Sequence, residues 1–141
     1  MFMGEYNHTV DTKGRLIVPS KFREQLGETF VVTKGLDNCL FVYDNTEWNI
    51  LEEKFSALPI TNASARKFAR FFLGSANICE VDKQGRVLLP AGLRDYAKID
   101  KDAVLVGVGS RIEIWSKELW IQANTYDDMN EIAENMEGLG I

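Results

Sequence analysis

The chain contains the same motif twice, and few folds accommodate such a duplication within 141 residues. Residues 11–23 read DTKGRLIVPSKFR and residues 82–94 read DKQGRVLLPAGLR. Aspartate, glycine, arginine, proline and a second arginine therefore recur in the same order, at an offset of 71 positions. Each half, with roughly 70 residues, would bury little apolar surface alone. We therefore expect the two halves to share one core about a pseudo-twofold axis.

Hydrophobic periodicity and turn residues predict the same order of elements in each half: strand, turn, strand, short helix, hairpin and helix. In the first half these are strands 3–10 and 15–18, a helix to Leu26 capped by Ser20, hairpin strands 29–34 and 39–43, and a helix to about residue 57 opened by the capping box Asp44–Glu47. In the second half they are strands 77–81 and 86–89, helix 91–97, hairpin strands 103–108 and 111–115, and a helix capped by Ser116. Strands mixed with short helices predict the α+β class, with two tandem β-rich halves that form a small barrel flanked by short helices.

The predicted elements divide the chain into four segments. The first repeat spans residues 1–60 and the second spans residues 75–125. Residues 61–74 form a connecting helix, whose apolar stripe at i, i+3, i+4 and i+7 is expected to face inward: Ala65, Phe68, Ala69 and Phe72. Its basic residues lie away from that stripe: Arg66, Lys67 and Arg70. Residues 126–141 form an acidic helix or tail.

Charge is distributed unevenly along the chain. The net charge is −5, and residues 127–141 hold five acids and no base, so the remainder is neutral. The first copy of the motif, residues 11–23, holds four bases and one acid. Because screening limits electrostatic attraction to about 8–10 Å in physiological salt, the local excess of +3 governs attraction to phosphate there.

The acidic segment admits two interpretations. It is either a disordered tail that grips a protein partner, or a helix that packs on its own body or on a neighbouring subunit. Met129, Ile132 and Met136 follow one another at i, i+3 and i+7, which favours the helix.

The motif itself has two possible roles. Aspartate at the start of a turn accepts bonds from backbone N–H groups, and glycine supplies a positive φ, so Asp11, Gly14, Asp82 and Gly85 are expected to support the turns. The arginines could pair with these aspartates as purely structural groups. Alternatively, the basic residues of the motif present cations to phosphates and base edges of DNA: Arg15, Arg86, Lys13, Lys21, Arg23 and Lys83.

Enzymatic and metal-binding functions find little support in the sequence. His8 is the only histidine, and no nucleophile–base constellation, P-loop or HExxH pattern is present. If Asp11 and Asp82 formed a dyad, their arginine neighbours would lower the carboxyl pKa values, the wrong direction for a general acid. Cys39 and Cys79 lack a metal-binding spacing and are expected to be reduced, half-buried thiols. We expect no cofactor, metal or small-molecule substrate.

The location of the protein follows from what the sequence lacks. No apolar run approaches the roughly 18 residues of a membrane span, and residues 1–8 do not resemble a signal peptide. A cytoplasmic protein without a membrane partner is expected.

Taken together, the residues resemble the MraZ family. The resemblance rests on the paired motifs Asp11…Arg15 and Asp82…Arg86, and on the stretches Phe2–Tyr6, Gly14–Pro19 and Phe71–Gly74, and it covers essentially the whole chain. It implies a bacterial transcriptional regulator made of two fused halves similar to AbrB-like, swapped-hairpin barrels. It also implies a ring-shaped homo-oligomer that binds short direct repeats in the promoter of its own division and cell-wall gene cluster, and hence an association with the nucleoid.

The resemblance makes Arg15 the leading DNA contact and Arg86 its counterpart. The second copy has Gln84 in place of Lys13 and Gly92 in place of Lys21, so the first copy is expected to face DNA more strongly. The alternative function is an antitoxin-like protein-interaction module in which the Asp–Arg pairs are structural.

Overall fold

The computed structural model describes residues 1–141 and contains six α-helices and eight strands. The elements of the first half are β1 (Phe2–Thr9), β2 (Arg15–Ile17), α1 (Ser20–Leu26), β3 (Thr29–Lys34), β4 (Leu40–Tyr43) and α2 (Asn45–Ser56). They are followed by α3 (Ala63–Gly74), β5 (Asn77–Glu80), β6 (Arg86–Leu88), α4 (Ala91–Ala97), β7 (Asp102–Gly109), β8 (Ile112–Ser116), α5 (Lys117–Ala123) and α6 (Met129–Asn135), with a 3₁₀ turn at Glu137–Leu139. The predicted α+β class and the repeated order of elements are confirmed.

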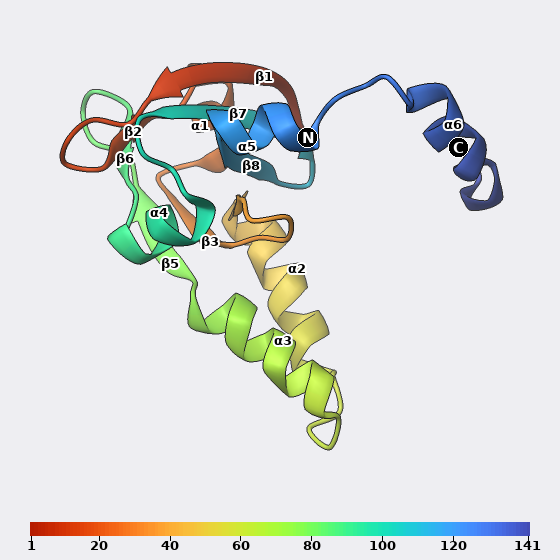
Figure 1. Ribbon diagram of the computed structural model, residues 1–141. Helices are drawn as coiled ribbons and strands as arrows, with labels where there is room; N and C mark the ends of the chain where they lie inside the picture. Colours follow the sequence, from red (N-terminus) through yellow and green to blue (C-terminus); the bar gives the residue numbers. More distant parts are fainter.

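Strands from the two repeats are interleaved within one antiparallel sheet. Its order is β1-β7-β8-β4-β3-β5, so β1 pairs with a strand of the second repeat and β5 with a strand of the first (Figure 1). In the middle of the sheet, β4 pairs with β8, which joins the two hairpins. Neither repeat forms a sheet of its own, because the hydrogen bonds of each are completed by the other.

A second, two-stranded sheet pairs the two copies of the motif. β2 and β6 run antiparallel with Leu16 opposite Val87. Single bridges, Val10 to Leu16 and Val81 to Val87, connect this ribbon to the ends of β1 and β5. Regular strand pairing does not close the sheets into a barrel, so the barrel and its swapped-hairpin topology stay a prediction.

The sheets enclose a core to which both repeats contribute. The largest cluster has 19 buried residues and includes Leu16 and Phe22 from the first repeat and Val87 and Leu93 from the second. These four are apolar residues at matching positions of the two motifs, and each is at most 3% exposed. The repeated sequence thus lies where the pseudo-twofold axis passes through the core.

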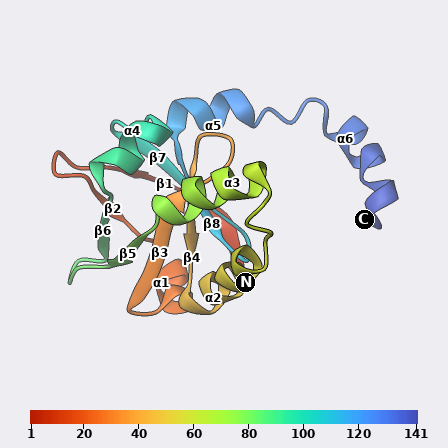
Figure 2. The same ribbon diagram turned by 90° about the horizontal axis from the view of Figure 1, so that it is seen from below.

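Helices α2 and α3 form a hairpin that projects from the sheets (Figures 1 and 2). The two helices pack through stacked aromatic rings, with Phe55 and Phe68 5.6 Å apart between ring centroids. Phe72 at the base of the hairpin is buried, as predicted, but Phe68 is 40% exposed. Phe68 faces inward as predicted, because its ring stacks on Phe55 and Phe72, but this packing leaves part of the ring exposed.

Helix caps follow the sequence with one exception. Asp44, Asn62 and Ser116 each accept the backbone N–H three residues on, which starts α2, α3 and α5. Ser20 does not cap α1: Pro19 occupies the N-cap position and Ser20 is the first helical residue. The fixed φ of proline, −53° here, already sets the turn into the helix, so that no side-chain cap is needed.

The two cysteines are free thiols, with Cys39 buried and Cys79 half-buried. Burial raises the pKa of both thiols, so neither is a reactive thiolate. None of the six helices has both the length and the apolar character that a bilayer crossing requires.

Candidate nucleic-acid interface

The first copy of the motif is a turn organised by the carboxylate of Asp11. Its Oδ1 accepts the backbone N–H groups of Lys13 and Arg15, at 3.0 and 2.9 Å. Its Oδ2 accepts Nε–H of the Arg15 side chain at 2.6 Å. Gly14 adopts a φ of +87°, which allows the chain to reverse direction between them. The turn therefore fixes both the backbone and the guanidinium of Arg15.

The second copy repeats this geometry. Asp82 Oδ1 accepts the backbone N–H groups of Gln84 and Arg86, both at 2.9 Å, and its Oδ2 accepts Nε–H of Arg86 at 2.8 Å. Gly85 has a φ of +76°. The duplication therefore extends to individual hydrogen bonds, and Asp11, Gly14, Asp82 and Gly85 have the geometry of turn-supporting residues.

The ribbon of β2 and β6 brings the two turns to the same end of the molecule, where both loops protrude (Figures 1 and 2). Val18 N–H donates to the carbonyl of Gly85, and Leu89 N–H donates to the carbonyl of Gly14, each at 2.9 Å. Each turn is thus anchored by a backbone bond from the opposite repeat. The two arginine-bearing turns form one rigid unit.

The outer face of this ribbon carries arginine and apolar side chains in alternation. Leu16 and Val87 face the core, so their neighbours along each strand face outward. Arg15 lies opposite Leu88, and Ile17 lies opposite Arg86. Leu88 is 59% exposed and Ile17 is 43% exposed, which is high for residues in strands. These two apolar residues were not identified from the sequence as part of the site. Both copies of the motif nevertheless place an apolar residue two positions after the arginine, where it shares the face of a strand with that arginine.

Arg86 is more engaged with carboxylates than Arg15. Besides its bond to Asp82, its Nη1 lies 3.9 Å from Oδ2 of Asp11 in the other turn. The Arg15 side chain is 32% exposed and that of Arg86 is 25% exposed. Since an arginine has five N–H donors, each retains donors directed away from its aspartate.

Both aspartates remain ionised in this environment. The pKa of Asp11 lies below its ordinary value of 3.8, mainly because the carboxylate accepts the backbone N–H of Arg15. The hydrogen bond from the side chain of Arg15 lowers this pKa further. Arg86 lowers the pKa of Asp82 in the same way. The direction predicted from the sequence is confirmed, and neither carboxyl could serve as a general acid near neutral pH.

A second arginine of each motif reaches across to the other repeat. The guanidinium of Arg23 lies so close to Gly85 that a Cβ built on this glycine would be 1.6 Å from its Nη1. Arg94 lies against Gly14 in the same way: a Cβ built on Gly14 would be 2.8 Å from Cζ of Arg94. Nε–H of Arg94 also donates to the carbonyl of Leu89 at 3.0 Å. Sequence reasoning included Arg23 but missed Arg94, which the offset of 71 positions identifies as its equivalent.

The three predicted lysines are exposed and form no ion pairs: Lys13, Lys21 and Lys83. With Arg15, Arg23 and Arg86 they make six bases against the two aspartates of the turns, an excess of four positive charges. Such a local excess attracts phosphate even when the whole chain is acidic.

Comparisons with known proteins agree with the duplication. A family model described as "MraZ protein, putative antitoxin-like" matches the chain twice, at residues 1–71 and 72–139. A protein of Desulfitobacterium hafniense named "Transcriptional regulator MraZ" is 62% identical over 143 aligned positions that cover 100% of both chains. Proteins of the same name from Thermoanaerobacter sp. and Clostridium acetobutylicum are 57% and 58% identical, again over 100% of both chains.

Proposed function

Because the chain belongs to the MraZ family, whose curated relatives are named transcriptional regulators, we propose that it is a DNA-binding transcriptional regulator and not an enzyme. A protein of this kind acts in the cytoplasm, in association with the nucleoid. The single observation that carries the proposal is the ribbon of β2 and β6, which holds Arg15 and Arg86 on one exposed face.

The ribbon has the chemistry that a DNA-reading element needs. A two-stranded ribbon fits the major groove of B-DNA, where an arginine pairs bidentately with guanine. Each Asp–Arg bond uses Nε–H, so both terminal amino groups of Arg15, and Nη2 of Arg86, are left to donate to a base edge. Ile17 and Leu88 lie beside them on the same face, where apolar side chains can contact thymine methyl groups.

The remaining bases act on the DNA backbone. Lys13 and Lys83 are exposed in the two turns and Lys21 is exposed on α1. All three are suited to phosphate contacts, as is Arg23 from its place against Gly85. Arg15 is the stronger reader of the pair, because Arg86 also neutralises Asp11 across the ribbon.

The target and the assembly follow from the family resemblance. We propose a ring-shaped homo-oligomer with swapped-hairpin halves that binds direct repeats in the promoter of its own division and cell-wall gene cluster. A ring that presents many copies of a small interface raises affinity through effective concentration, and head-to-tail contacts suit direct repeats.

A salt-titrated mobility-shift assay tests the proposal on DNA from upstream of the protein's own gene. Arg15→Ala should lose specific binding while retaining the wild-type circular dichroism spectrum and oligomer size. Lys101→Ala, which removes an exposed charge outside the ribbon, is the control and should bind as the wild type does. Retention of specific binding by Arg15→Ala at physiological salt would refute the role of Arg15.

The alternative is an antitoxin-like interaction module, which is favoured by the description of the matching family model and by the engagement of each arginine with its own aspartate. In that case the assembled wild-type protein would show no preference for the promoter over unrelated DNA of equal length. The same assay therefore separates the two functions.

A further inference from the structure

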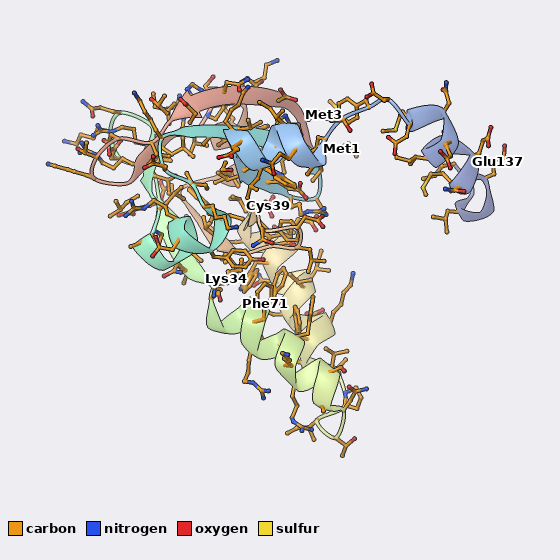
Figure 3. The ribbon with its side chains drawn as sticks, viewed as in Figure 1. Met1, Met3, Lys34, Cys39, Phe71 and Glu137 are labelled. Carbon is orange, nitrogen blue, oxygen red and sulfur yellow. The ribbon has the colours of Figure 1, made fainter.

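The acidic segment at residues 126–141 makes no packing contact with the body of its own chain. In Figures 1 and 2, α6 lies beyond a linker that leads away from α5, and Figure 3 shows Glu137 on this segment with no other element around it. Its residues are exposed except for Met136, and its only packing is between α6 and the 3₁₀ turn. A helix of seven residues is marginal in water, so the segment needs a surface elsewhere.

We propose that this segment docks on the α2–α3 hairpin of a second copy of the chain. The proposal concerns a contact between copies and goes beyond the assignment of the DNA interface. Helix α3 of this hairpin has the opposite charge, and it adjoins an uncovered apolar surface at Leu73.

Charge complementarity supports this choice of partner. Helix α3 holds three bases and no acid, and none of the three forms an ion pair: Arg66, Lys67 and Arg70. The docking segment holds five acids and no base: Asp127, Asp128, Glu131, Glu134 and Glu137. No other helix of the chain combines basic side chains with a complete lack of acidic ones.

The apolar surfaces also correspond. Arg66, Arg70 and Leu73 follow at i, i+4 and i+7 along one side of α3, so the basic row leads directly to Leu73. Leu73 is 38% exposed and forms the edge of a groove of about 440 Å³, whose lining includes Trp48 and the 81% exposed Ile78.

The docking segment has an apolar row beside its acids. Met129 and Ile132 are 41% and 37% exposed, and Met136 continues the row one turn on. With Ile132 against the groove, Asp128 lies one turn away on the same side of α6 and, with Asp127 before it, is the acid placed to meet Arg66 and Arg70. Apolar side chains of this size, flexible in the case of methionine, suit a shallow groove.

A photocrosslinking experiment on the full-length protein tests the contact. Ile132 is replaced by the photoreactive residue p-benzoylphenylalanine, and equal amounts of ¹⁴N- and ¹⁵N-labelled protein are mixed before irradiation. We expect mixed-isotope adducts within residues 63–78 of the second chain. Adducts within one chain, adducts at other positions, or the absence of adducts would each overturn the proposal.

Charge reversal provides the second measurement. Arg66→Glu with Arg70→Glu should reduce the yield of these adducts at least fivefold, and Asp127→Arg with Asp128→Arg added to the same chain should restore it. The control, Lys98→Glu with Lys101→Glu, reverses two exposed charges outside the hairpin and should leave the yield unchanged. A yield that does not respond to reversal on α3 would also overturn the proposal. No DNA is needed, so this result is independent of the promoter-binding assay.

Discussion

Arg23 of the first repeat lies against Gly85 of the second, and Arg94 of the second lies against Gly14 of the first. Each turn that presents an arginine is therefore covered by an arginine from the other repeat. Because the glycines have positive φ and no side chain, they provide the space that these guanidinium groups occupy. The two turns cannot change shape independently.

The first prediction concerns this close approach. Gly85→Ala should lower the free energy of unfolding by about 2–4 kcal/mol, through left-handed backbone strain of about 1–2 kcal/mol and displacement of Arg23. In an Arg23→Ala background the same change should cost about 1–2 kcal/mol, because only the backbone strain remains. Urea unfolding of the four proteins gives the coupling energy.

Gly109→Ala is the control for this cycle. Gly109 has a φ of +89° and no atom within 4 Å of a built Cβ, so its substitution reports backbone strain alone. A cost at Gly85 that does not depend on Arg23 would show that the contact has no energetic consequence.

The second prediction concerns pH. The pKa values of Asp11 and Asp82 are lowered from 3.8 in the folded state, so the unfolded chain binds more protons as the pH falls through this range. The stabilisation from these groups is therefore complete well above pH 4 and is lost as the pH falls through their folded-state pKa values. Asp11→Asn with Asp82→Asn should flatten the acid limb of a plot of unfolding free energy against pH. If the double variant and the wild type had the same slope of unfolding free energy against pH between pH 2 and 5, this prediction would be contradicted.

The third prediction concerns the attachment of α3 to the sheet. The hydroxyl of Thr33, which is fully buried, donates to the backbone carbonyl of Phe72 at 2.6 Å. Thr33→Val keeps the shape but leaves this carbonyl without its partner, and should lower the free energy of unfolding by about 1–3 kcal/mol. Thr33→Ser retains the hydroxyl and should restore the bond at the cost of one methyl group. If Thr33→Val were as stable as the wild type, the hydrogen bond would contribute nothing.

The fourth prediction concerns cooperativity. Since the strands of the two repeats are interleaved in one sheet and share one core, the whole sheet should unfold in a single transition. Leu16→Ala, at the centre of the ribbon and fully buried, should lower the free energy of unfolding by about 2–5 kcal/mol and leave the transition single. Scanning calorimetry checks this, and two resolved transitions would show that the repeats fold separately.

Features that depend on neighbouring residues could be predicted from the sequence. The bonds of Asp11 and Asp82 are made within four residues of each carboxylate, so the spacing of aspartate, glycine and arginine was enough to predict them. The caps at Asp44 and Ser116 are equally local. The prediction for Ser20 failed because Pro19 sets the helix start through its own φ, a competing local effect.

Features that depend on the pairing of distant residues could not be predicted. The duplication indicated a pseudo-twofold axis, but it did not give the register of β2 with β6, in which Leu16 lies opposite Val87. This register brings Arg86 near Asp11. It also places Ile17 and Leu88 on the same face as the arginines. Likewise, the apolar stripe of α3 predicted which side is inward, yet the exposure of Phe68 depends on how far the hairpin projects beyond the sheet. The DNA contacts of Arg15, Lys13 and the other bases stay predictions.

The pairing of β1 with β7 also affects how the protein is made. Residues of β1 leave the ribosome long before their partners in β7, with Phe2 opposite Gly109. During synthesis β1 therefore has an open edge and exposed apolar side chains until most of the second repeat has emerged. Contacts between such distant residues slow folding and leave intermediates open to aggregation. A nascent chain halted after the first repeat would be a substrate for chaperones rather than a smaller regulator.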